Sequence, residues 1–370
     1  MQPDVTDLEN LPQEEKERLR QTGLETDISR RAGSYFQKDQ EIVHATSGTK
    51  GVEILGVSEA LEKYDWMKDY YWNAVSREKD RITQYVAKQE KPKGVVVIAR
   101  KGVKTTLPLQ ACLYLSEQNI QHVHNIFIAE EGAEMHVISG CASASYRYTG
   151  SHLGVSEFYI HDDARITSTM IHNWGEKISV FPRSAAVIQK NGLFISNYVC
   201  MQPVKKVEMY PTATLVGEHA VARFSSIVMA HPGSSLDIGS RAILSGKDTS
   251  AELITRAITR GGTVISRGHI LGETDGTKGH IECKGLILKD GLIHAIPEIE
   301  GRVVGTALSH EAAVGKIARD EIDYLISRGL DEEVATATII RGFLDVKIQG
   351  LPEALQKQID AAIDVAEKGF

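Results

Sequence analysis

The stretch HPGSSLDIGSRAILSG (231–246) contains the pattern that decides the fold: a turn of small and polar residues, followed at once by a short run of β-forming residues. The same unit recurs as EEGAEMHV (130–137), HDDARITST (161–169) and RGGTVISRG (260–268). From about residue 93 to 303, short β-branched runs follow one another, and no helix of normal length fits between them. Such a series predicts an all-β region: a sandwich, a barrel or a solenoid.

The turns decide between these architectures. A sandwich is the commoner case, but two-residue Asn-Gly or Asp-Gly hairpin turns are scarce, and QKNGLF (189–194) and KDGLI (289–293) are the clearest. A small residue directly before each strand is what a coil of a parallel β-helix needs to turn its corner. The pattern therefore favours a mainly β fold built as a parallel β-helix, slightly ahead of a sandwich.

Helical regions are expected on both sides of this core, which spans residues 93–303. Residues 1–92 form the N-terminal region, where LPQEEKERLRQTGL (11–24) has helical spacing and Gly23 can end the helix. A second, aromatic-rich helix is expected in WMKDYYWNAVSREKDRITQYVAKQ (66–89), before a boundary at KPKG (91–94).

The C-terminal region, residues 304–370, is predicted to be helical as well. The stretch ALSHEAAVGKIARDEIDYLISRGLDEEVATATIIRGFLDV (307–346) has the character of two helices, with Gly329 as the C-cap of the first and Asp331 as the N-cap of the second. A last helix is expected to begin at Pro352.

Composition excludes several classes of function. The 370-residue chain has a formal net charge of −7 and no dense Lys/Arg block, so nucleic acid is not an expected partner. No run approaches the ~18–20 apolar residues of a membrane span, so no membrane contact is expected. The polar, acidic N-terminus does not look like a secretory signal. The four cysteines are far apart and form no CxxC pair, which predicts reduced thiols in a cytoplasmic protein: Cys112, Cys141, Cys200 and Cys283.

The short motifs of the chain carry little chemistry on their own. Neither GxxxxGK[ST] nor GxGxxG is present, so we expect no ATP or NAD on this chain. HVH (122–124) with Glu130 resembles a cupin metal site, but its spacing is longer than that motif usually shows, so surface or core histidines explain it better. In GHIECKG (279–285), alternation along a strand would place His280 and Glu282 on one face and Cys283 on the other. A buried cysteine of this kind is ordinarily a packing residue, but a thiolate also suits a soft metal or an iron–sulfur cluster.

The C-terminal stretch SHEAAVGKIARDEIDYLISRGLDEEVATATIIRGF (309–343) resembles the C-terminal signature of the SufB/SufD family of iron–sulfur cluster assembly proteins. The resemblance extends through HIECKGLIL (280–288), TSTMIHNWGE (167–176) and AEMHVISGCASA (133–144). It implies a right-handed parallel β-helix with helical ends. It also implies that residues 304–370 dock onto SufC, an ABC-type ATPase that carries the ATP chemistry.

The resemblance also implies roles for individual residues. Cys283, His310 and Glu311 match its cluster site, and Glu282 and His294 are weaker candidates. Cys141 matches a sulfur-accepting cysteine, and Trp174, Lys190 and His172 match its internal sulfur path, with His172 standing where a Gln is usual. Helix residues of the C-terminal module are the expected contacts with the ATPase: Ile317, Tyr324, Leu325, Arg328, Arg341 and Phe343.

These residues favour a scaffold that builds a transient cluster, 4Fe–4S in type, at a dimer interface. Because Cys141 and Cys283 are both present on a short chain, the resemblance is closest to a SufB-like, minimal archaeal form that works as a homodimer, or else pairs with a paralogue. The sulfur donor is unknown. Two alternatives stay open: an adaptor subunit that recruits the ATPase but carries no cluster, and a carbohydrate-active β-helix enzyme.

Overall fold

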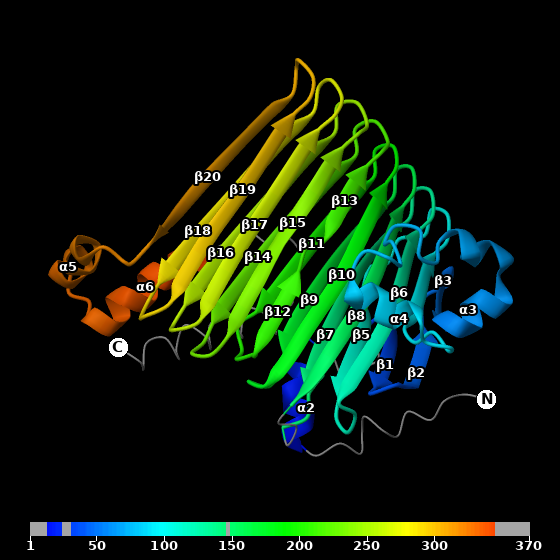
Figure 1. The fold of residues 1–370 in the computed structure, drawn as a ribbon, viewed down its shortest axis with the longest axis horizontal. Helices are drawn as coiled ribbons and strands as arrows, with labels where there is room; N and C mark the ends of the chain where they lie inside the picture. Colours follow the sequence, from blue (N-terminus) through cyan, green and yellow to red (C-terminus); the bar gives the residue numbers. More distant parts are fainter. Residues whose placement is uncertain (1–12, 24–30, 146–148, 345–370) are drawn as a thin grey trace.

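The computed structural model describes residues 13–23, 31–145 and 149–344. These residues form a parallel β-solenoid in which the chain passes alternately through two ten-stranded sheets (Figure 1). This confirms the mainly β, solenoid prediction and excludes the sandwich.

The first sheet, here called sheet A, follows the order β2-β1-β5-β7-β9-β11-β14-β16-β18-β20. Its strands are β1 (Gly33–Lys38), β2 (Glu41–Ser47), β5 (Leu109–Leu115), β7 (Glu134–Ser143), β9 (Arg165–Asn173), β11 (Leu193–Cys200), β14 (Val221–Ala230), β16 (Ser250–Thr259), β18 (Lys278–Ile287) and β20 (Ala307–Gly315). Sheet B contains β3 (Val52–Gly56), β4 (Val95–Ala99), β6 (Ile120–Ala129), β8 (Gly150–Ile160), β10 (Ile178–Ile188), β12 (Lys206–Met209), β13 (Thr212–Leu215), β15 (Ser235–Leu244), β17 (Thr263–Gly272) and β19 (Leu292–Gly301).

The corners that lead from sheet B to sheet A repeat one backbone device. Each has a residue with positive φ, in the left-handed region that Gly, Asn and Asp tolerate best. These residues are Gly102, Gly132, Asp163, Asn191, His219, Asp248, Gly276 and Gly305. In six of them, from Gly102 to Asp248, the backbone N–H bonds to the next coil: the N–H of Asp163 donates to the carbonyl of Lys190 at 2.8 Å and that of Asn191 to Glu218 at 2.9 Å. Residues 130–137 and 161–169 of the recurring sequence unit supply two of these corners, whereas residues 231–246 and 260–268 begin at corners that lead from sheet A to sheet B.

The interior between the sheets is filled by one continuous apolar cluster. At its centre four aromatic rings lie in a row: Phe127, Phe158, Phe194 and Phe224, with successive centroids 4.8, 5.0 and 5.9 Å apart. Because both sheets contribute to this row, burial of these rings fastens the two walls of the solenoid to each other.

At the N-terminal end of the solenoid the outermost strands run antiparallel to their neighbours. β2 pairs antiparallel with β1, β3 pairs antiparallel with β4, and β2 and β3 contact one another. The short helices α3 (Val57–Lys63), η2 (Asp65–Asp69) and α4 (Arg81–Ala87) cover the first strands of sheet B.

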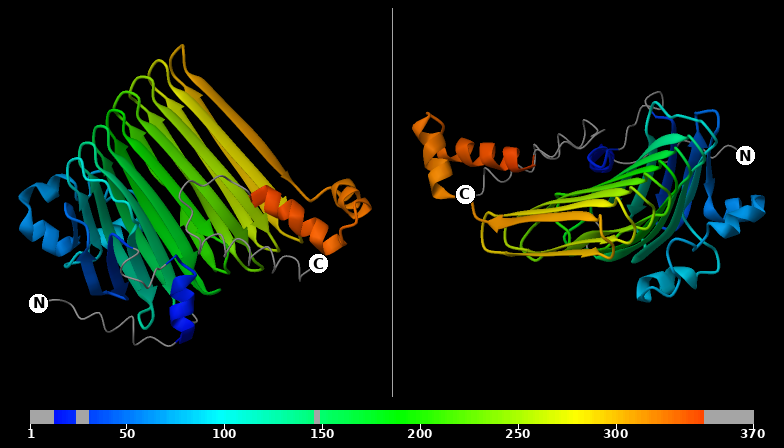
Figure 2. Two further views of the ribbon diagram at one scale, coloured as in Figure 1. Left: turned by 180° about the vertical axis from the view of Figure 1, so that it is seen from behind. Right: turned by 90° about the horizontal axis from the view of Figure 1, so that it is seen from above.

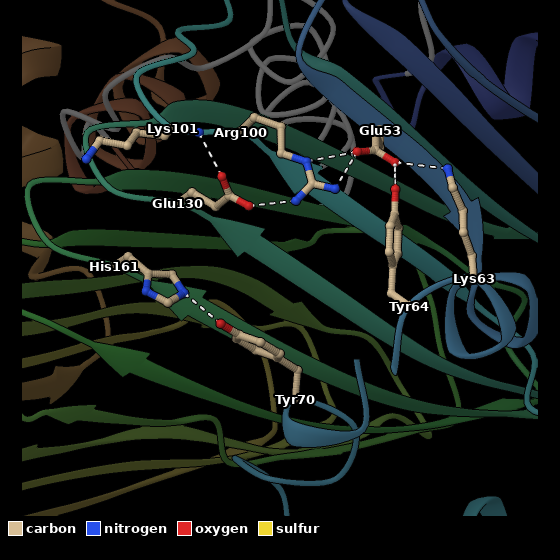
Figure 3. A network of polar contacts seen from close by, with 8 residues as sticks. All are labelled: Glu53, Lys63, Tyr64, Tyr70, Arg100, Lys101, Glu130 and His161. Atoms are coloured by element: carbon tan, nitrogen blue, oxygen red, sulfur yellow. Dashed lines mark hydrogen bonds and ion pairs between the residues drawn. The ribbon is translucent and has the colours of Figure 1, made fainter. Parts of the chain in front are cut away.

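Polar contacts at this end hold β3 to the strands beside it (Figure 3). Arg100, directly after β4, pairs with Glu53 of β3 and with Glu130 after β6, the latter at 2.7 Å. Burial opposes ionisation of Glu53, but hydrogen bonds from Tyr64, Arg100 and Lys63 outweigh it and lower the pKa of this carboxyl to about 2. The guanidinium is thus fully paired within the fold.

A buried carboxylate fastens the loop after η2 to sheet B. Glu157 of β8 accepts hydrogen bonds from the backbone N–H groups of Trp72, Ala74 and Val75 at 2.6–2.8 Å. His124, from the HVH motif, places Nε2 2.8 Å from the same carboxylate. His124 is therefore a core histidine that partners Glu157, and for this residue the HVH motif is not a metal site but part of the core.

The C-terminal end differs from the N-terminal end. β19 and β20 are the last strands of their sheets, and the described residues place no further strand beside either one. Their residues are mostly exposed, and Val304 in the corner between them is 98% exposed. Within the described chain the solenoid thus ends in an open edge.

Two helices follow this edge: α5 (Arg319–Ser327) and α6 (Glu332–Leu344). The C-cap residue of α5 is Arg328 rather than the predicted Gly329, which follows it with a φ of +93° and ends the helix, and Asp331 directly precedes α6. α6 lies on the outer face of sheet A, and α2 (Gln13–Arg20) contacts the same sheet nearer its N-terminal end (Figure 2). The helix expected from Pro352 lies outside the described residues.

Three predictions about secondary structure were wrong. Residues 307–315 are strand β20 rather than helix, because pairing with β18 outweighs the helix propensity of SHEAAVG. The N-terminal region contains strands β1 to β3 as well as helices. Residues 66–89 do not form one helix: Trp72 has a φ of +63°, and Asp80 caps a separate helix, α4.

The left-handed backbone conformation at the corners predicts how the stability of the fold depends on Asn191. Its φ of +54° disfavours a β-branched residue, whereas glycine adopts this conformation freely. We expect Asn191→Val to lower the free energy of unfolding by about 1–2 kcal/mol. Asn191→Gly, which loses only the exposed hydrogen bond to Asp163, should cost less. Urea unfolding checks this, and equal losses in the two variants would contradict a backbone origin.

Candidate functional site

Strand β18 places Cys283 inside the solenoid. Residues alternate along this strand, so that Ile281 and Cys283 are buried while His280, Glu282 and Lys284 lie on the outer face. Cys283 is 3% exposed, and its Sγ lies 3.7 Å from Oγ of Ser266 on the facing sheet. Burial raises the pKa of this thiol. Only one coil separates it from the open end, because β18 pairs directly with β20.

The register between β18 and β20 divides the predicted cluster ligands. His310 lies opposite Ile281, and Ala312 lies opposite Cys283, so His310 is on the same inner face as the thiol. Glu311 lies opposite Glu282, on the outer face. His294 is exposed beside buried Ile293 on β19, which puts it on the outside of the other sheet. The structure therefore brings Cys283 and His310 to one face and separates them from the remaining candidates.

The outer face of sheet A carries a group of its own. Ligand atoms of His280, Glu282 and Glu311 all lie within 4.8 Å of one another, and this is the single such group among the described residues. Nζ of Lys284 bridges the two carboxylates, 2.8 Å from Glu282 and 3.1 Å from Glu311. Arg256 pairs with the other oxygen of Glu282.

A row of buried residues runs through the interior, one coil after another, and it includes a thiol, an imidazole and an indole. Leu113, Cys141 and His172 are neighbours on successive strands β5, β7 and β9. Trp174 is buried directly after β9, 5.7 Å from His172 between ring centroids. Both Nε2 of His172 and Nε1 of Trp174 are buried without a hydrogen-bond partner. Three of the predicted path residues thus lie together in the interior.

Lys190 does not join them. It is exposed at a corner of the solenoid, where its backbone supports the turn of the coil before it. The sequence analysis missed Tyr198 and Cys200, which occupy the interior instead. Tyr198 places its hydroxyl 3.0 Å from Nδ1 of His172. Alternation along LFISNYVC would have assigned both residues to the face of Phe194, which is the interior.

Burial controls the protonation of this interior row. It lowers the pKa of His172 to about 3, so the imidazole is neutral at physiological pH. It raises the pKa of Cys141 and of Cys200 to about 12, so both are thiols. The row can therefore donate and accept hydrogen bonds, but it holds no permanent charge.

The predicted docking residues fall into two groups. Ile317 and Phe343 pack against the apolar cluster between α6 and sheet A. Phe343 also lies beneath Arg256, 6.0 Å from its Cζ to the ring centroid. Tyr324 on α5 is 58% exposed, and the guanidinium of Arg328 lies over its ring. Leu325 is half-buried, and Arg328 and Arg341 are exposed.

A hollow elsewhere on the protein is a competing candidate site. It has a volume of about 660 Å³ and is lined by Trp66, Tyr70, Arg100, Glu130 and His161, among others. Since Arg100 is neutralised by two carboxylates, the hollow offers no free charge for an anion. None of the described helices is long and apolar enough to cross a bilayer.

Residues 113–343 match the family model of the SufBD core domain of SUF system FeS cluster assembly. This span runs from the interior row to the last described helix and includes the thiol beneath the open end.

The chain belongs to the SufBD family.

Individual relatives agree. A SufBD family protein of Archaeoglobus fulgidus is 47% identical over 355 residues, covering 96% of this chain and 95% of the relative. One of Methanothermobacter thermautotrophicus is 42% identical over 373 residues, covering 99% and 91%. A Staphylococcus aureus member is 28% identical, covering 98% of this chain and 80% of its own. The SufBD protein described here therefore has a role in SUF iron–sulfur cluster assembly.

The buried thiols of this SufBD protein predict low reactivity. At pH 7.5 we expect its four cysteines to react with a disulfide reagent at least about 100-fold more slowly than free cysteine, because burial keeps them protonated. In guanidinium all four should react rapidly. Time-resolved thiol titration checks this, with Cys141→Ser and Cys200→Ser to assign the phases. Rapid labelling of Cys141 or Cys200 in the folded protein would show that the interior is open to solvent.

Proposed function

We propose that this SufBD protein is a scaffold on which a nascent iron–sulfur cluster is built, between two chains that meet at their open ends. The single observation that carries the proposal is the position of Cys283: an inward-facing thiol one coil below an unpaired edge of the solenoid. A second chain across that edge would bring two such thiols toward one axis while shielding them from water.

The open edge itself supports pairing. A terminal strand presents a row of unpaired N–H and C=O groups, which another chain can satisfy. Here two strands, β19 and β20, end side by side. Exposed apolar residues accompany them: Leu292, Ile299, Val303, Val304 and Val314. A homodimer is the simplest occupant of this edge, and a paralogue of the same fold is the alternative.

The proposed ligand set suits a cluster that the scaffold must later release. Cys283 supplies a thiolate and His310 an imidazole from the same face, and a two-fold axis would double both. We expect mixed Cys/His ligation to hold the cluster less tightly than four thiolates. Glu311, Glu282 and His294 face elsewhere and are secondary candidates, reachable only if the edge is remodelled on pairing. A transient 4Fe–4S cluster remains the proposed cargo.

ATP hydrolysis is assigned to a SufC-like ABC-type ATPase docked on α5 and α6. SUF membership supports such a partner. A physical link supports coupling: Phe343 of α6 contacts Arg256, which pairs with Glu282 directly beside Cys283. Movement of α6 would therefore be transmitted through Arg256 and Glu282 to strand β18, which carries the thiol.

Sulfur would enter along the interior row. Cys141 accepts it, and His172 and Trp174 offer unpartnered polar groups on the way. Because Cys141 is fully buried, delivery requires the solenoid to open. Lys190 would take part only as a support of the corner.

The adaptor function is the second candidate. It is favoured by the raised pKa of Cys283, which is the ordinary state of a packing cysteine. In that case the chain would recruit the ATPase, and another protein would carry the cluster.

Anaerobic reconstitution with iron and sulfide separates these two functions. We expect the wild-type dimer to acquire an oxygen-sensitive visible chromophore, and Cys283→Ala to lose most of it. Cys112→Ala is the matched control, since Cys112 is equally buried but lies on the outer face of sheet A under α2. If the protein binds no iron or sulfide even with its ATPase, the scaffold function is excluded and the adaptor stands.

Docking can be tested separately. Tyr324→Ala should weaken binding of the ABC-type ATPase by about 30-fold or more if this exposed ring is an interface anchor. Tyr85→Ala is the control, since Tyr85 is 39% exposed at the opposite end of the protein. Calorimetric titration measures both. Equal affinities in the two variants would place the docking surface away from α5.

A further inference from the structure

We propose that His172 is the general base that activates Cys141 for sulfur transfer, and that Tyr198 and Cys200 hold its imidazole in the tautomer that this role requires. The sulfur-accepting role of Cys141 rests on the proposed function, whereas the grouping of the four side chains rests on the register of the strands and on one hydrogen bond.

Three adjacent strands of sheet A, β7, β9 and β11, bring these side chains together (Figure 1). Cys141 of β7 lies opposite His172 of β9. The pairing of β9 with β11 continues the row to Cys200, one residue beyond the pair formed by Ile171 and Val199. Because neighbouring strands lie about 4.8 Å apart, the imidazole of His172 is within reach of a thiol on either side.

One ring nitrogen of His172 is engaged, and the other is left for the thiol. The hydroxyl of Tyr198 lies 3.0 Å from Nδ1. Nε2, which points away from Nδ1, is buried and has no hydrogen-bond partner. Cys141 is the lateral neighbour on the β7 side, and its thiol carries a proton that Nε2 can take. A nucleophile, an adjacent base and a third group that orients the base are the parts from which proteins build an activated thiol.

A second contact of Tyr198 fixes the tautomer of the base. Burial raises the pKa of Cys200 to about 12, and a hydrogen bond with Tyr198 opposes that rise. We assign the phenolic proton to Sγ of Cys200, so that the phenolic oxygen accepts a hydrogen bond from Nδ1–H of His172. Nε2 then carries the lone pair. Without Cys200 the phenol is free to donate to Nδ1 instead, which places the ring proton on Nε2 and blocks the base.

The sulfur source that suits this arrangement is a persulfide, R–S–SH, whose outer sulfur is transferred. Nε2 of His172 takes the proton of Cys141, and the thiolate attacks the outer sulfur of the donor. A new S–S bond forms while the S–S bond of the donor breaks, and the electron pair of the broken bond leaves on the inner sulfur. The proton on Nε2 then goes to that sulfur. One thiol and one persulfide give another persulfide and another thiol, with no net oxidation or reduction.

Burial keeps the base inactive until the interior opens. Desolvation lowers the pKa of His172 to about 3 and raises that of Cys141 to about 12, so proton transfer between them is strongly uphill in the closed solenoid. Among the titratable groups that face His172, the neighbouring His152 of β8 adds to the lowering, and Tyr198 and Cys200 are uncharged. Water that enters with the donor removes the desolvation, and the two pKa values return toward about 6.5 and 8.5. The thiol is thus inert at rest and becomes a nucleophile when the interior opens.

The test measures sulfur transfer from glutathione persulfide to Cys141 in the full-length apo-protein, by mass spectrometry of the peptide that contains this residue. Donor concentrations are kept in the range where the rate is proportional to concentration, so that chemistry and not opening limits the rate. At pH 7 we expect His172→Gln, which keeps a polar side chain but removes the base, to lower the rate constant by about 100-fold. Tyr198→Phe should lower it less. Both losses should shrink as the pH rises toward 9, because the thiolate then forms without a base.

His136→Gln is the matched control. His136 is on the same strand as Cys141 but on its outer face, where Nε2 lies 3.3 Å from Oγ1 of Thr169. This variant should transfer sulfur at the wild-type rate at every pH. Circular dichroism verifies that each variant is folded.

The outcomes separate this inference from the scaffold function. A wild-type rate in His172→Gln at pH 7 would overturn the base, and so would a loss that is the same at every pH or no sulfur on Cys141 in the wild-type chain. If Cys141 gains sulfur in a manner that depends on His172 while no cluster forms on any variant, the scaffold function fails and the base stands. If a cluster forms at Cys283 while His172→Gln takes up sulfur as the wild type does, the base is wrong and the scaffold stands.

Discussion

Backbone hydrogen bonding between one coil and the next governs the whole molecule. Each strand satisfies its N–H and C=O groups with the strand one coil away, and the corners do the same through residues in the left-handed conformation. The consequence is that residues one coil apart in the sequence become lateral neighbours with fixed facing. Every functional grouping described above, whether the interior row, the inward thiol or the outer carboxylates, is a product of this register.

That dependence explains which features the sequence could predict. The turn-then-strand unit is local, so residues such as Asp163 and Asn191 indicate a solenoid without knowledge of long-range pairing. Alternation within GHIECKG is local too, and it correctly separated Glu282 from Cys283. The position of Glu311 relative to Cys283 is not local, because it depends on whether β20 pairs with β18 in one register or a shifted one. The same long-range pairing turned SHEAAVG, rich in helix-forming residues, into a strand.

Single side chains were harder still. Lys190 was assigned to the interior by resemblance, but its position at a corner follows from the backbone geometry of the coil. Tyr198 and Cys200 carry no motif, and their contact with His172 arises only when β9 and β11 lie side by side. The link from Phe343 through Arg256 to Glu282 joins a helix to a strand far from it in sequence, and no periodicity indicates it. In each case the sequence does not reveal which residues become neighbours once the coils have stacked.

The unequal ends of the solenoid have a consequence for assembly. A repeat protein with two open ends can add copies indefinitely and grow into a fibre. Here the outermost strands at the N-terminal end run antiparallel to their neighbours, whereas those at the C-terminal end run parallel to theirs. In the proposed pairing through the C-terminal ends, growth would stop at two chains, because a parallel coil cannot continue past strands that run the other way. The antiparallel strands at the N-terminal end would then limit the stoichiometry of assembly at a place far from the candidate site residues.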